Sequence, residues 1–219
     1  MSDIVSFVEQ LKKQFPQKLP PVHLWNPPLS GDMDMRIAVD GKWFHEGDEI
    51  RRDALVTLFS SILKKENDEY FLVTPVEKWK IQVDCAPFVV VSFEQLVNQN
   101  ASDFPVLSFL TLTDDKVFVD ADHPVWVETH KNLKTGREEP LPFVMVRDGL
   151  KALIHRNVYY QLVELALESQ NELKNCDDGS EEGRSEEGSE KKVQQTDLFI
   201  SSGKERFSLK PKVRDQAAD

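Results

Sequence analysis

Residues 33–45 read Met-Asp-Met-Arg-Ile-Ala-Val-Asp-Gly-Lys-Trp-Phe-His, and this stretch indicates the fold class. Apolar residues occupy alternate positions through its first seven residues, which is the period of a half-buried β-strand. Asp40-Gly41 is a hairpin-turn signal, and Lys42–His45 is the predicted return strand. An amphipathic helix is predicted next, from about Asp48 to Lys65. A hairpin followed by a helix indicates an α+β protein.

The same order of elements returns near the end of the second half. Further strands are predicted at residues 69–74, 78–84, 88–91, 106–113, 116–120, 125–130, 141–147 and 150–154. Asp148-Gly149 turns the chain between the last two strands, and a helix is predicted from about Arg156 to Glu172. Ile50-Arg51-Arg52 and Ile154-His155-Arg156 open the two helices in the same way. From the residues alone, internal duplication and coincidence are both open. Duplication would give two similar lobes of mostly antiparallel strands, each with a helix.

The two ends of the chain differ from this body. Ile4, Phe7, Val8 and Leu11 recur with the spacing of one helical face, so residues 1–18 are predicted to form a helix. Residues 174–190 carry almost no apolar side chain, which is typical of a disordered linker. We predict an N-terminal lobe at 19–100, a C-terminal lobe at 101–173 and a polar, flexible tail at 174–219. Two apolar groups in the tail, Leu198-Phe199-Ile200 and Phe207 with Leu209, could instead dock on the body or on a partner.

Charge excludes one class of function. The chain has 27 basic and 38 acidic side chains, a net charge of −11, and residues 1–173 hold 18 of the basic and 27 of the acidic ones. A general nucleic-acid binder needs a basic surface to neutralise phosphates, so none is expected here. No run of about 20 apolar residues could span a membrane, and no secretory signal pattern is present, so we expect a cytoplasmic protein. The two cysteines make neither a disulfide framework nor a metal cage.

Recognisable catalytic motifs are missing from the sequence. It contains no nucleophile elbow, no phosphate-binding glycine loop and no zinc-type histidine cluster. Asp32 and Asp34 share one face of the predicted strand, where they could hold a divalent ion with Glu46 or Asp48. They could equally form a solvated face balanced by Arg36. A metal-assisted hydrolase that uses Asp32, Asp34 and His45 is therefore an alternative function, and no cofactor is identified.

Arginines at the starts of the predicted helices need partners. The helix dipole favours anions in the first turn, so Arg52 and Arg156 gain nothing from it. Each could pair with a carboxylate of the body, or could hold an anion that also binds the free backbone N–H groups of the helix start. Trp25 lies in a proline-rich connector and could line a cleft between lobes.

Longer ordered motifs cover about residues 15–170. They are Pro20-Pro21-Val22-His23-Leu24-Trp25-Asn26-Pro27, Gly31-Asp32-Met33-Asp34-Met35-Arg36-Ile37, Asp40-Gly41-Lys42-Trp43-Phe44, Ile50-Arg51-Arg52, Leu72-Val73-Thr74-Pro75-Val76-Glu77-Lys78, Ala86-Pro87-Phe88, Val146-Arg147-Asp148-Gly149-Leu150-Lys151-Ala152 and Arg156-Asn157-Val158-Tyr159-Tyr160-Gln161-Leu162. Together they resemble a bacterial family of unknown function, domain of unknown function 1285. The resemblance implies a duplicated core of two α+β lobes, the C-terminal one pleckstrin-homology-like. It also implies a cleft between the lobes for a nucleotide-like ligand and a role in signal transduction.

The predicted function is therefore a ligand-binding or regulatory module that senses a small anionic, nucleotide-like ligand between two lobes. Its phosphate or carboxylate groups would be held by arginines, its ring covered by a tryptophan, and its hydroxyl or amino groups bound by aspartates. The residues expected in these roles are Arg36, Arg52, Arg147, Arg156, Trp25, Asp32 and Asp34. Besides the hydrolase, which lacks a base paired with a nucleophile, a second alternative is a protein-interaction module. It would bind another chain through its lobes or through Leu198-Phe199-Ile200.

Overall fold

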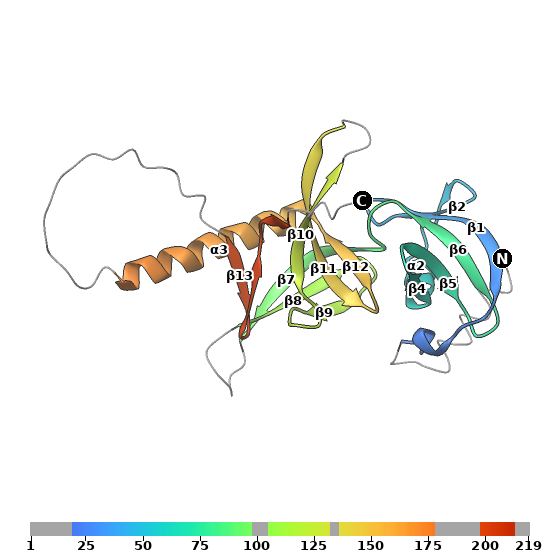
Figure 1. Cartoon of the computed structure of the whole chain (residues 1–219), viewed down its shortest axis with the longest axis horizontal. Coiled ribbons are helices and arrows are strands. Elements are labelled where there is room, and N and C mark those ends of the chain that lie inside the picture. The colour runs from blue at the N-terminus through green and yellow to red at the C-terminus, as the bar shows by residue number, and fades with distance from the viewer. Residues whose placement is uncertain (1–18, 98–104, 132–135, 178–197, 213–219) are drawn as a thin grey trace, which may run out of the picture.

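Two main β-sheets, one from each half of the chain, make up most of the fold (Figure 1). The computed structural model describes residues 19–97, 105–131, 136–177 and 198–212. The predicted helix in residues 1–18 lies outside these ranges. Strands dominate the described residues and helices are few, so the predicted two-lobed arrangement of strands with a few helices is confirmed.

The first sheet, which forms the N-terminal lobe, has six strands. In spatial order they are β3 (Asp48–Glu49), β2 (Trp43–His45), β1 (Leu29–Ile37), β6 (Lys78–Val83), β5 (Glu69–Val73) and β4 (Leu63–Glu66). A short 3-10 helix, η1 (Val22–Leu24), precedes β1, and α2 (Asp53–Ser61) connects β3 to β4. The helix is shorter than predicted because Leu63–Glu66 pairs antiparallel with β5 instead of continuing it.

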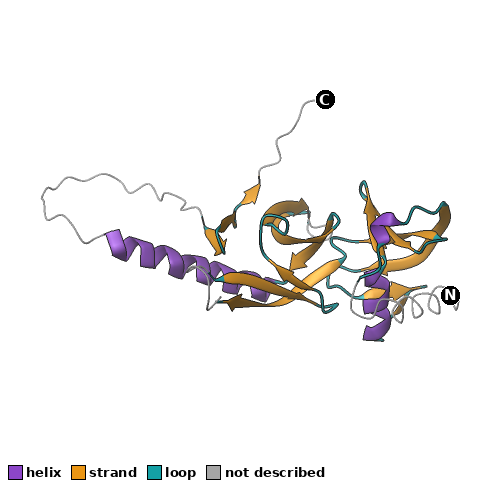
Figure 2. Cartoon of the chain, turned by 90° about the horizontal axis from the view of Figure 1, so that it is seen from below, coloured by secondary structure: helices purple, strands orange, loops and turns teal. Residues whose placement is uncertain are grey.

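The second sheet, in the C-terminal lobe, has seven strands. In spatial order they are β15 (Pro211–Lys212), β10 (Val125–Lys131), β11 (Glu138–Arg147), β12 (Leu150–Ile154), β7 (Phe88–Leu96), β8 (Val106–Thr111) and β9 (Lys116–Phe118). The long helix α3 (Arg156–Asp177) follows β12 and projects beyond the sheet (Figure 2). No helix in the described ranges is long and apolar enough to cross a membrane.

The two sheets share one strand order. The spatial order in the first sheet is β3-β2-β1-β6-β5-β4, and six strands of the second sheet have the order β9-β8-β7-β12-β11-β10. The two orders are the same when β1–β6 is matched with β7–β12. In each, two antiparallel three-stranded units meet through one parallel pair, β1 with β6 and β7 with β12. The helices differ in position, because α2 follows the third strand of its sheet and α3 follows the sixth.

The boundary between the sheets falls between β6 and β7. It therefore precedes the position near residue 100 that the sequence indicated. The physical reason is non-local, since β7 is placed in the second sheet by its parallel pairing with β12, about 60 residues later in the chain. Nothing in the sequence around Phe88 carries that information.

The two Asp-Gly turns have different places in the shared strand order. Asp148-Gly149 joins β11 to β12 directly, and both residues have positive φ, 45° and 76°. Asp40-Gly41 lies in the longer connection between β1 and β2, where only Gly41 has positive φ, 83°. The turns therefore connect different strand pairs, and Arg52 and Arg156 do not stand at equivalent helix starts.

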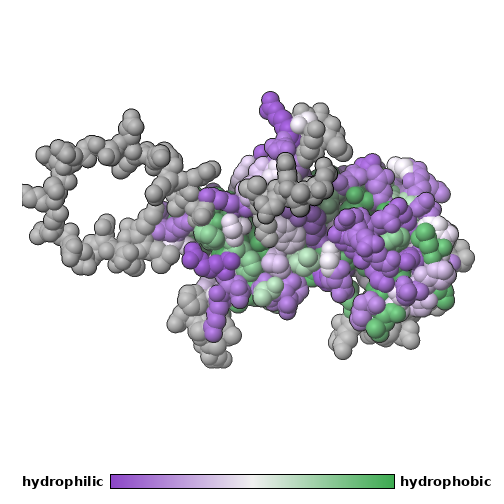
Figure 3. Space-filling model, viewed as in Figure 1, coloured by the Kyte–Doolittle hydropathy of each residue, from purple (hydrophilic) through white to green (hydrophobic). Residues whose placement is uncertain are grey.

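A single cluster of buried side chains spans both sheets. Trp43 stacks on Phe59 of α2, with ring centroids 6.2 Å apart, and Phe88, Phe109 and Val144 extend the cluster into the C-terminal lobe. Each side chain of this size contributes about 1.5–3 kcal/mol by leaving water. Polar residues cover much of the visible surface, with apolar residues scattered among them (Figure 3). The two lobes thus share one hydrophobic core.

The segment after the polar linker is folded, which corrects the prediction of a flexible tail for residues 198–212. β13 (Phe199–Ser202) and β14 (Glu205–Ser208) form a hairpin, and β15 pairs with β10. Ile200, Phe207 and Leu209 are buried in the shared cluster. The two apolar groups seen in the sequence therefore dock on the body, because their burial offsets the cost of ordering the segment.

Candidate functional site

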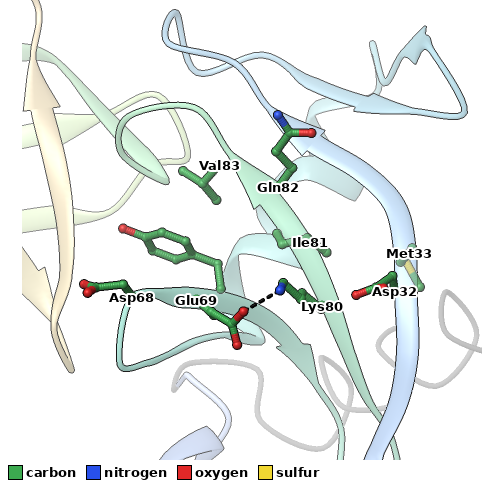
Figure 4. Close-up of a pocket in the computed structure, with 9 residues that line it drawn as sticks. Asp32, Met33, Asp68, Glu69, Lys80, Ile81, Gln82 and Val83 are labelled. Atoms are coloured by element: carbon green, nitrogen blue, oxygen red, sulfur yellow. Dashed lines mark hydrogen bonds and ion pairs between the residues drawn. The ribbon is translucent and has the colours of Figure 1, made fainter. Parts of the chain in front are cut away.

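An open pocket of about 470 Å³ lies over strands of the N-terminal lobe (Figure 4). Neighbouring strands β1, β6 and β5 supply its walls, because β6 pairs with the other two. Asp32 lies at the β1 side of the pocket and Asp68 at the opposite end. The lining residues are Asp32, Met33, Asp68, Glu69, Tyr70, Lys80, Ile81, Gln82 and Val83.

Carboxylates dominate the charge of this pocket. Lys80 is the one basic side chain among the nine lining residues, against Asp32, Asp68 and Glu69. The Lys80 ammonium donates a hydrogen bond to Glu69, and this contact raises the pKa of Lys80. Asp32 is the register partner of Lys80 across the parallel pair of β1 and β6. A ligand with positive charge or several hydrogen-bond donors therefore suits this surface better than a phosphate does.

Tyr70 lines the pocket and is near enough to Glu128 of the C-terminal lobe for the charge of Glu128 to act on its hydroxyl. Burial raises the pKa of its hydroxyl, and the charges of Cys85, Asp68 and Glu128 raise it further. Glu128 belongs to β10, so this residue brings the influence of the second sheet to the edge of the pocket. Burial also raises the pKa of the Cys85 thiol, although Lys151 acts in the opposite direction. The thiol therefore stays protonated at neutral pH and is a poor nucleophile.

Glu128 is the centre of a polar cluster on the C-terminal lobe. Its carboxylate accepts hydrogen bonds from Lys151 Nζ at 2.9 Å and Trp126 Nε1 at 2.6 Å, and His130 Nε2 lies 3.0 Å away. Burial alone would raise the pKa of Glu128, but the hydrogen bonds from Lys151, Trp126 and His130 outweigh it and lower the pKa to about 2. Lys151 also lies 3.8 Å from the ring centroid of Phe143. The ionised carboxylate therefore links β10 to β12 across β11.

The lowered pKa predicts how stability depends on pH. The charged form of Glu128 stabilises the folded state above the ordinary pKa of 4.5, and this contribution is lost as pH falls from about 4.5 to about 2. Because the side chain is 29% exposed, we expect Glu128→Gln to cost about 1–2 kcal/mol at pH 7. Urea unfolding at pH 7 and pH 3 would measure it.

The matched control for that experiment is Glu94→Gln. Glu94 is 69% exposed and lies 3.8 Å from Lys116, so its replacement should change stability by less than about 0.5 kcal/mol. A loss from Glu128→Gln that is equally large at both pH values would contradict the role given to its charge.

Arg147 has a structural set of partners. Its guanidinium lies 2.5 Å from Asp115 Oδ1, donates to the carbonyl oxygen of Ser60 at 2.9 Å, and lies 4.7 Å from the ring centroid of Phe88. Asp115 is held in turn by the Thr113 hydroxyl at 2.7 Å. Since Ser60 lies in the last turn of α2 in the N-terminal lobe and Arg147 ends β11, the arginine joins the two lobes.

The other residues expected to bind a ligand are spread over the fold. Arg36 pairs with Asp84 at 3.4 Å. Arg156 lies over the ring of Tyr160, and Arg52 is exposed at the N-cap of α2. Among the described residues, no two of the seven expected side chains share a hydrogen-bond, ion-pair or ring partner.

The remaining three lie along the start of the N-terminal lobe. The Trp25 ring packs against a small cluster that includes Phe71, and its carbonyl oxygen accepts from Lys64 at 2.9 Å. Asp34 is exposed, and its backbone oxygen lies 2.9 Å from His45 Nδ1. Asp32 lines the pocket and is the one expected site residue that does so.

The hydrolase alternative gains no ligand set from the structure. Within the described ranges, no group of three or more histidine, cysteine, aspartate or glutamate side chains is placed to hold a metal ion. Asp32 lines the pocket, whereas His45 turns its ring to the backbone of Asp34 and to Glu46. His45 therefore contacts the backbone of Asp34 and not its carboxylate, and of the three residues named for this function Asp32 alone lines the pocket.

Sequence reasoning did not single out Tyr70, Lys80, Glu128 or Lys151. A signal existed for Lys80, because Lys78-Trp79-Lys80-Ile81 alternates within a predicted strand and places its lysines on one face. Glu128 and Lys151 meet across β11, from strands more than 20 residues apart, and no local pattern indicates that order.

Comparison with known proteins agrees with the resemblance seen in the motifs. Residues 20–86 match the N-terminal domain, and residues 87–176 the C-terminal domain, of the DUF1285 family of unknown function. A comparison with curated proteins found no match. A DUF1285 family protein from Silicibacter pomeroyi DSS-3, known from a crystal structure, is 48% identical with a TM-score of 0.60, over 68% of this chain and 78% of that one.

A second crystal structure, of a DUF1285 family protein from Shewanella baltica OS155, is 26% identical with a TM-score of 0.43, over 60% of this chain and 91% of that one. The two family-model matches adjoin at residues 86 and 87, in the connection between β6 and β7 where the first sheet gives way to the second. Both halves of the described fold are thus covered, and the chain belongs to the DUF1285 family.

Proposed function

We propose that this protein is a regulatory module that binds a small polar ligand in the pocket over strands β1, β6 and β5 of its N-terminal lobe, with the ligand acting as a signal. One observation carries the proposal. The pocket is built by the N-terminal lobe, yet the hydroxyl of its lining residue Tyr70 is influenced by Glu128 of the C-terminal lobe. The ligand we propose would be bound beside Tyr70 by one lobe, within range of the charge of Glu128 in the other.

Charge narrows the class of ligand. Asp32 has no hydrogen-bond or ion-pair partner among the described residues and lines the pocket, so an ammonium, guanidinium or hydroxyl group would find a carboxylate there. A phosphate would instead meet three acidic side chains. The arginines expected to hold an anion have partners elsewhere or, like Arg52, lie outside the pocket. The ligand we propose is therefore neutral or cationic, in place of the anionic one expected from the sequence.

Binding without catalysis is the simplest use of these groups. The Cys85 thiol is protonated, and the Lys80 ammonium is paired with Glu69, so neither is an activated nucleophile. The lining residues offer no nucleophile that is paired with a general base. We therefore propose a sensing role and not a hydrolytic one.

Calorimetry with three probes would test this function. Spermidine, adenosine and ATP represent a cationic, a neutral and an anionic ligand, and we expect spermidine or adenosine to bind and ATP not to bind. Asp32→Asn should weaken the binding about tenfold or more because the carboxylate at the pocket is lost. Asp34→Asn is the matched control, since Asp34 is exposed on the same strand and lies outside the lining.

Two results would contradict the proposal. One is failure of all three probes to bind. The other is binding of ATP that is unaffected by Asp32→Asn and is abolished by Arg52→Ala, which would restore the anion hypothesis.

The shared strand order supports a further proposal, that the two sheets arose by duplication. On this view β1–β6 corresponds to β7–β12, and the two Asp-Gly turns are unrelated. An alignment of family sequences in this register should match more buried positions than an alignment on the turns. The long helix α3 beside the second sheet supports the pleckstrin-homology-like assignment of the C-terminal lobe, which we keep as a proposal.

A further inference from the structure

The C-terminal strap, defined as residues 198–212, fills a groove on the C-terminal lobe. In the strap, β13 packs against α3 and β8, and β14 packs against β10 (Figure 1). Its apolar anchors are buried, with Ile200 1%, Phe207 8% and Leu209 4% exposed. The groove is therefore apolar and is closed by side chains of the strap.

Polar contacts fix the register of the strap in this groove. The buried Ser202 hydroxyl donates to the Val119 carbonyl oxygen at 2.6 Å and accepts from the Leu107 N–H at 3.0 Å. The Tyr159 hydroxyl of α3 donates to the Leu209 carbonyl oxygen at 3.1 Å. On β13, exposed Ser201 separates the buried residues Ile200 and Ser202, and half-buried Ser208 separates buried Phe207 from buried Leu209. The groove thus recognises a pattern, aliphatic-x-serine on one arm and phenylalanine-x-leucine after the other.

Several features distinguish the strap from the rest of the domain. Among the described strands, β13 and β14 pair only with each other, and β15 joins the main sheet only at Val127 and Glu128. The family match ends at residue 176, before the strap begins. The intervening residues 178–197 contain Val193 as their single large apolar residue. We call these 20 mostly polar residues the tether, because they join the strap to the domain as a linker would join a ligand to its receptor.

We propose that this groove is a peptide-binding site, and that the strap is its ligand, supplied by the same chain and replaceable by the same segment supplied from a second copy. A tether of 20 residues holds the strap at an effective concentration of roughly millimolar, so free peptide does not compete in the intact chain. Once the tether is cut, the strap becomes an ordinary dissociable ligand. This site lies apart from the ligand pocket of the N-terminal lobe and does not depend on it.

The experiment uses the full chain with a protease recognition sequence placed within residues 184–190. After cleavage, a fluorescent peptide of residues 196–214 is added, and its anisotropy reports entry into the groove. We expect the peptide to bind the cleaved protein at micromolar concentration and the uncut protein at least a hundredfold more weakly, because the tethered strap must first be displaced.

Variant peptides test the recognition pattern. Ile200→Asp should abolish binding because the buried anchor becomes charged. Ser201→Asp is the matched control, since Ser201 is the exposed neighbour on the same strand, and its peptide should bind within about threefold of the parent. Equal behaviour of the two variants would overturn the pattern and, with it, the proposed site.

Two further results would show that the strap is an inseparable part of the domain core. One is absence of exchange over days while the cleaved protein stays folded by near-ultraviolet circular dichroism. The other is loss of that signal when the cleaved strap leaves. Either would overturn the proposal, whereas exchange with the signal retained would support it.

Discussion

Replacing Arg147 with methionine is expected to lower the free energy of unfolding by about 2–4 kcal/mol. Methionine keeps an apolar chain beside Phe88 but removes the ion pair with Asp115 and the hydrogen bond to the Ser60 carbonyl. Both charged side chains of the pair are 16% exposed, so Asp115 would remain as a largely buried charge without its partner. Urea unfolding at pH 7 would measure the loss.

Arg156→Met is the control for that variant. Arg156 is exposed and contacts the Tyr160 ring from the start of α3, so its loss should cost less than about 0.5 kcal/mol. The comparison also separates two functions for Arg147. A residue kept to hold a ligand would lose binding without a large loss of stability, whereas the bridge between Ser60 and Asp115 predicts the reverse. Similar stabilities of the two variants would contradict the structural role.

Replacing Gly41 with alanine is expected to cost about 2–4 kcal/mol, for two separable reasons. Gly41 has a φ of 83°, where an L-residue is strained by about 1 kcal/mol. A Cβ there would also lie 3.0 Å from Val89 Cγ2 and 3.2 Å from Leu112 Cδ2, both in the C-terminal lobe. Overpacking of this kind costs about 1–3 kcal/mol more.

Gly47→Ala measures the first reason, backbone strain, by itself. Gly47 has nearly the same φ, 85°, and nothing lies within 4 Å of a Cβ built on it. Its replacement should therefore cost only the backbone strain, about 1 kcal/mol. The difference between the two variants in thermal or urea unfolding measures the packing of the β1–β2 connection against the C-terminal lobe. Equal losses of stability in the two variants would show that Val89 and Leu112 move aside for the added methyl group at no measurable cost.

Local patterns predicted the strands well and the helix of the N-terminal lobe less well. The strand Leu150–Ile154 was predicted with its observed bounds, because alternation and an Asp-Gly turn specify it within a few residues. The helix predicted to Lys65 ends at Ser61. Lysine and glutamate fit a helix or an exposed strand edge, and pairing with β5 decides between them.

The candidate site was predicted less well because it depends on strand order. Asp32 was found because it belongs to one local strand pattern, but the pocket needs β1, β6 and β5 side by side. Arg147 was expected to bind a ligand, and its carboxylate partner Asp115 lies 32 residues earlier in the chain. For the strap, the apolar groups were visible in the sequence, but their groove is assembled from α3, β8 and β10. Charge and the spacing of apolar residues indicate which side chains need a partner. The identity of the partner depends on the order of the strands in the assembled sheets.

In each sheet one parallel pair joins the two three-stranded units. Because the chain is synthesised from its N-terminus, these pairs determine which sheet can be completed first. The first sheet joins β1 to β6, so all its strands have been synthesised once residue 83 has emerged. The second cannot join β7 to β12 before residue 154 emerges, and its groove stays open to solvent until residue 212 follows. During synthesis the N-terminal lobe can therefore serve as a folded template, while the apolar groove of its neighbour is the last surface to be covered.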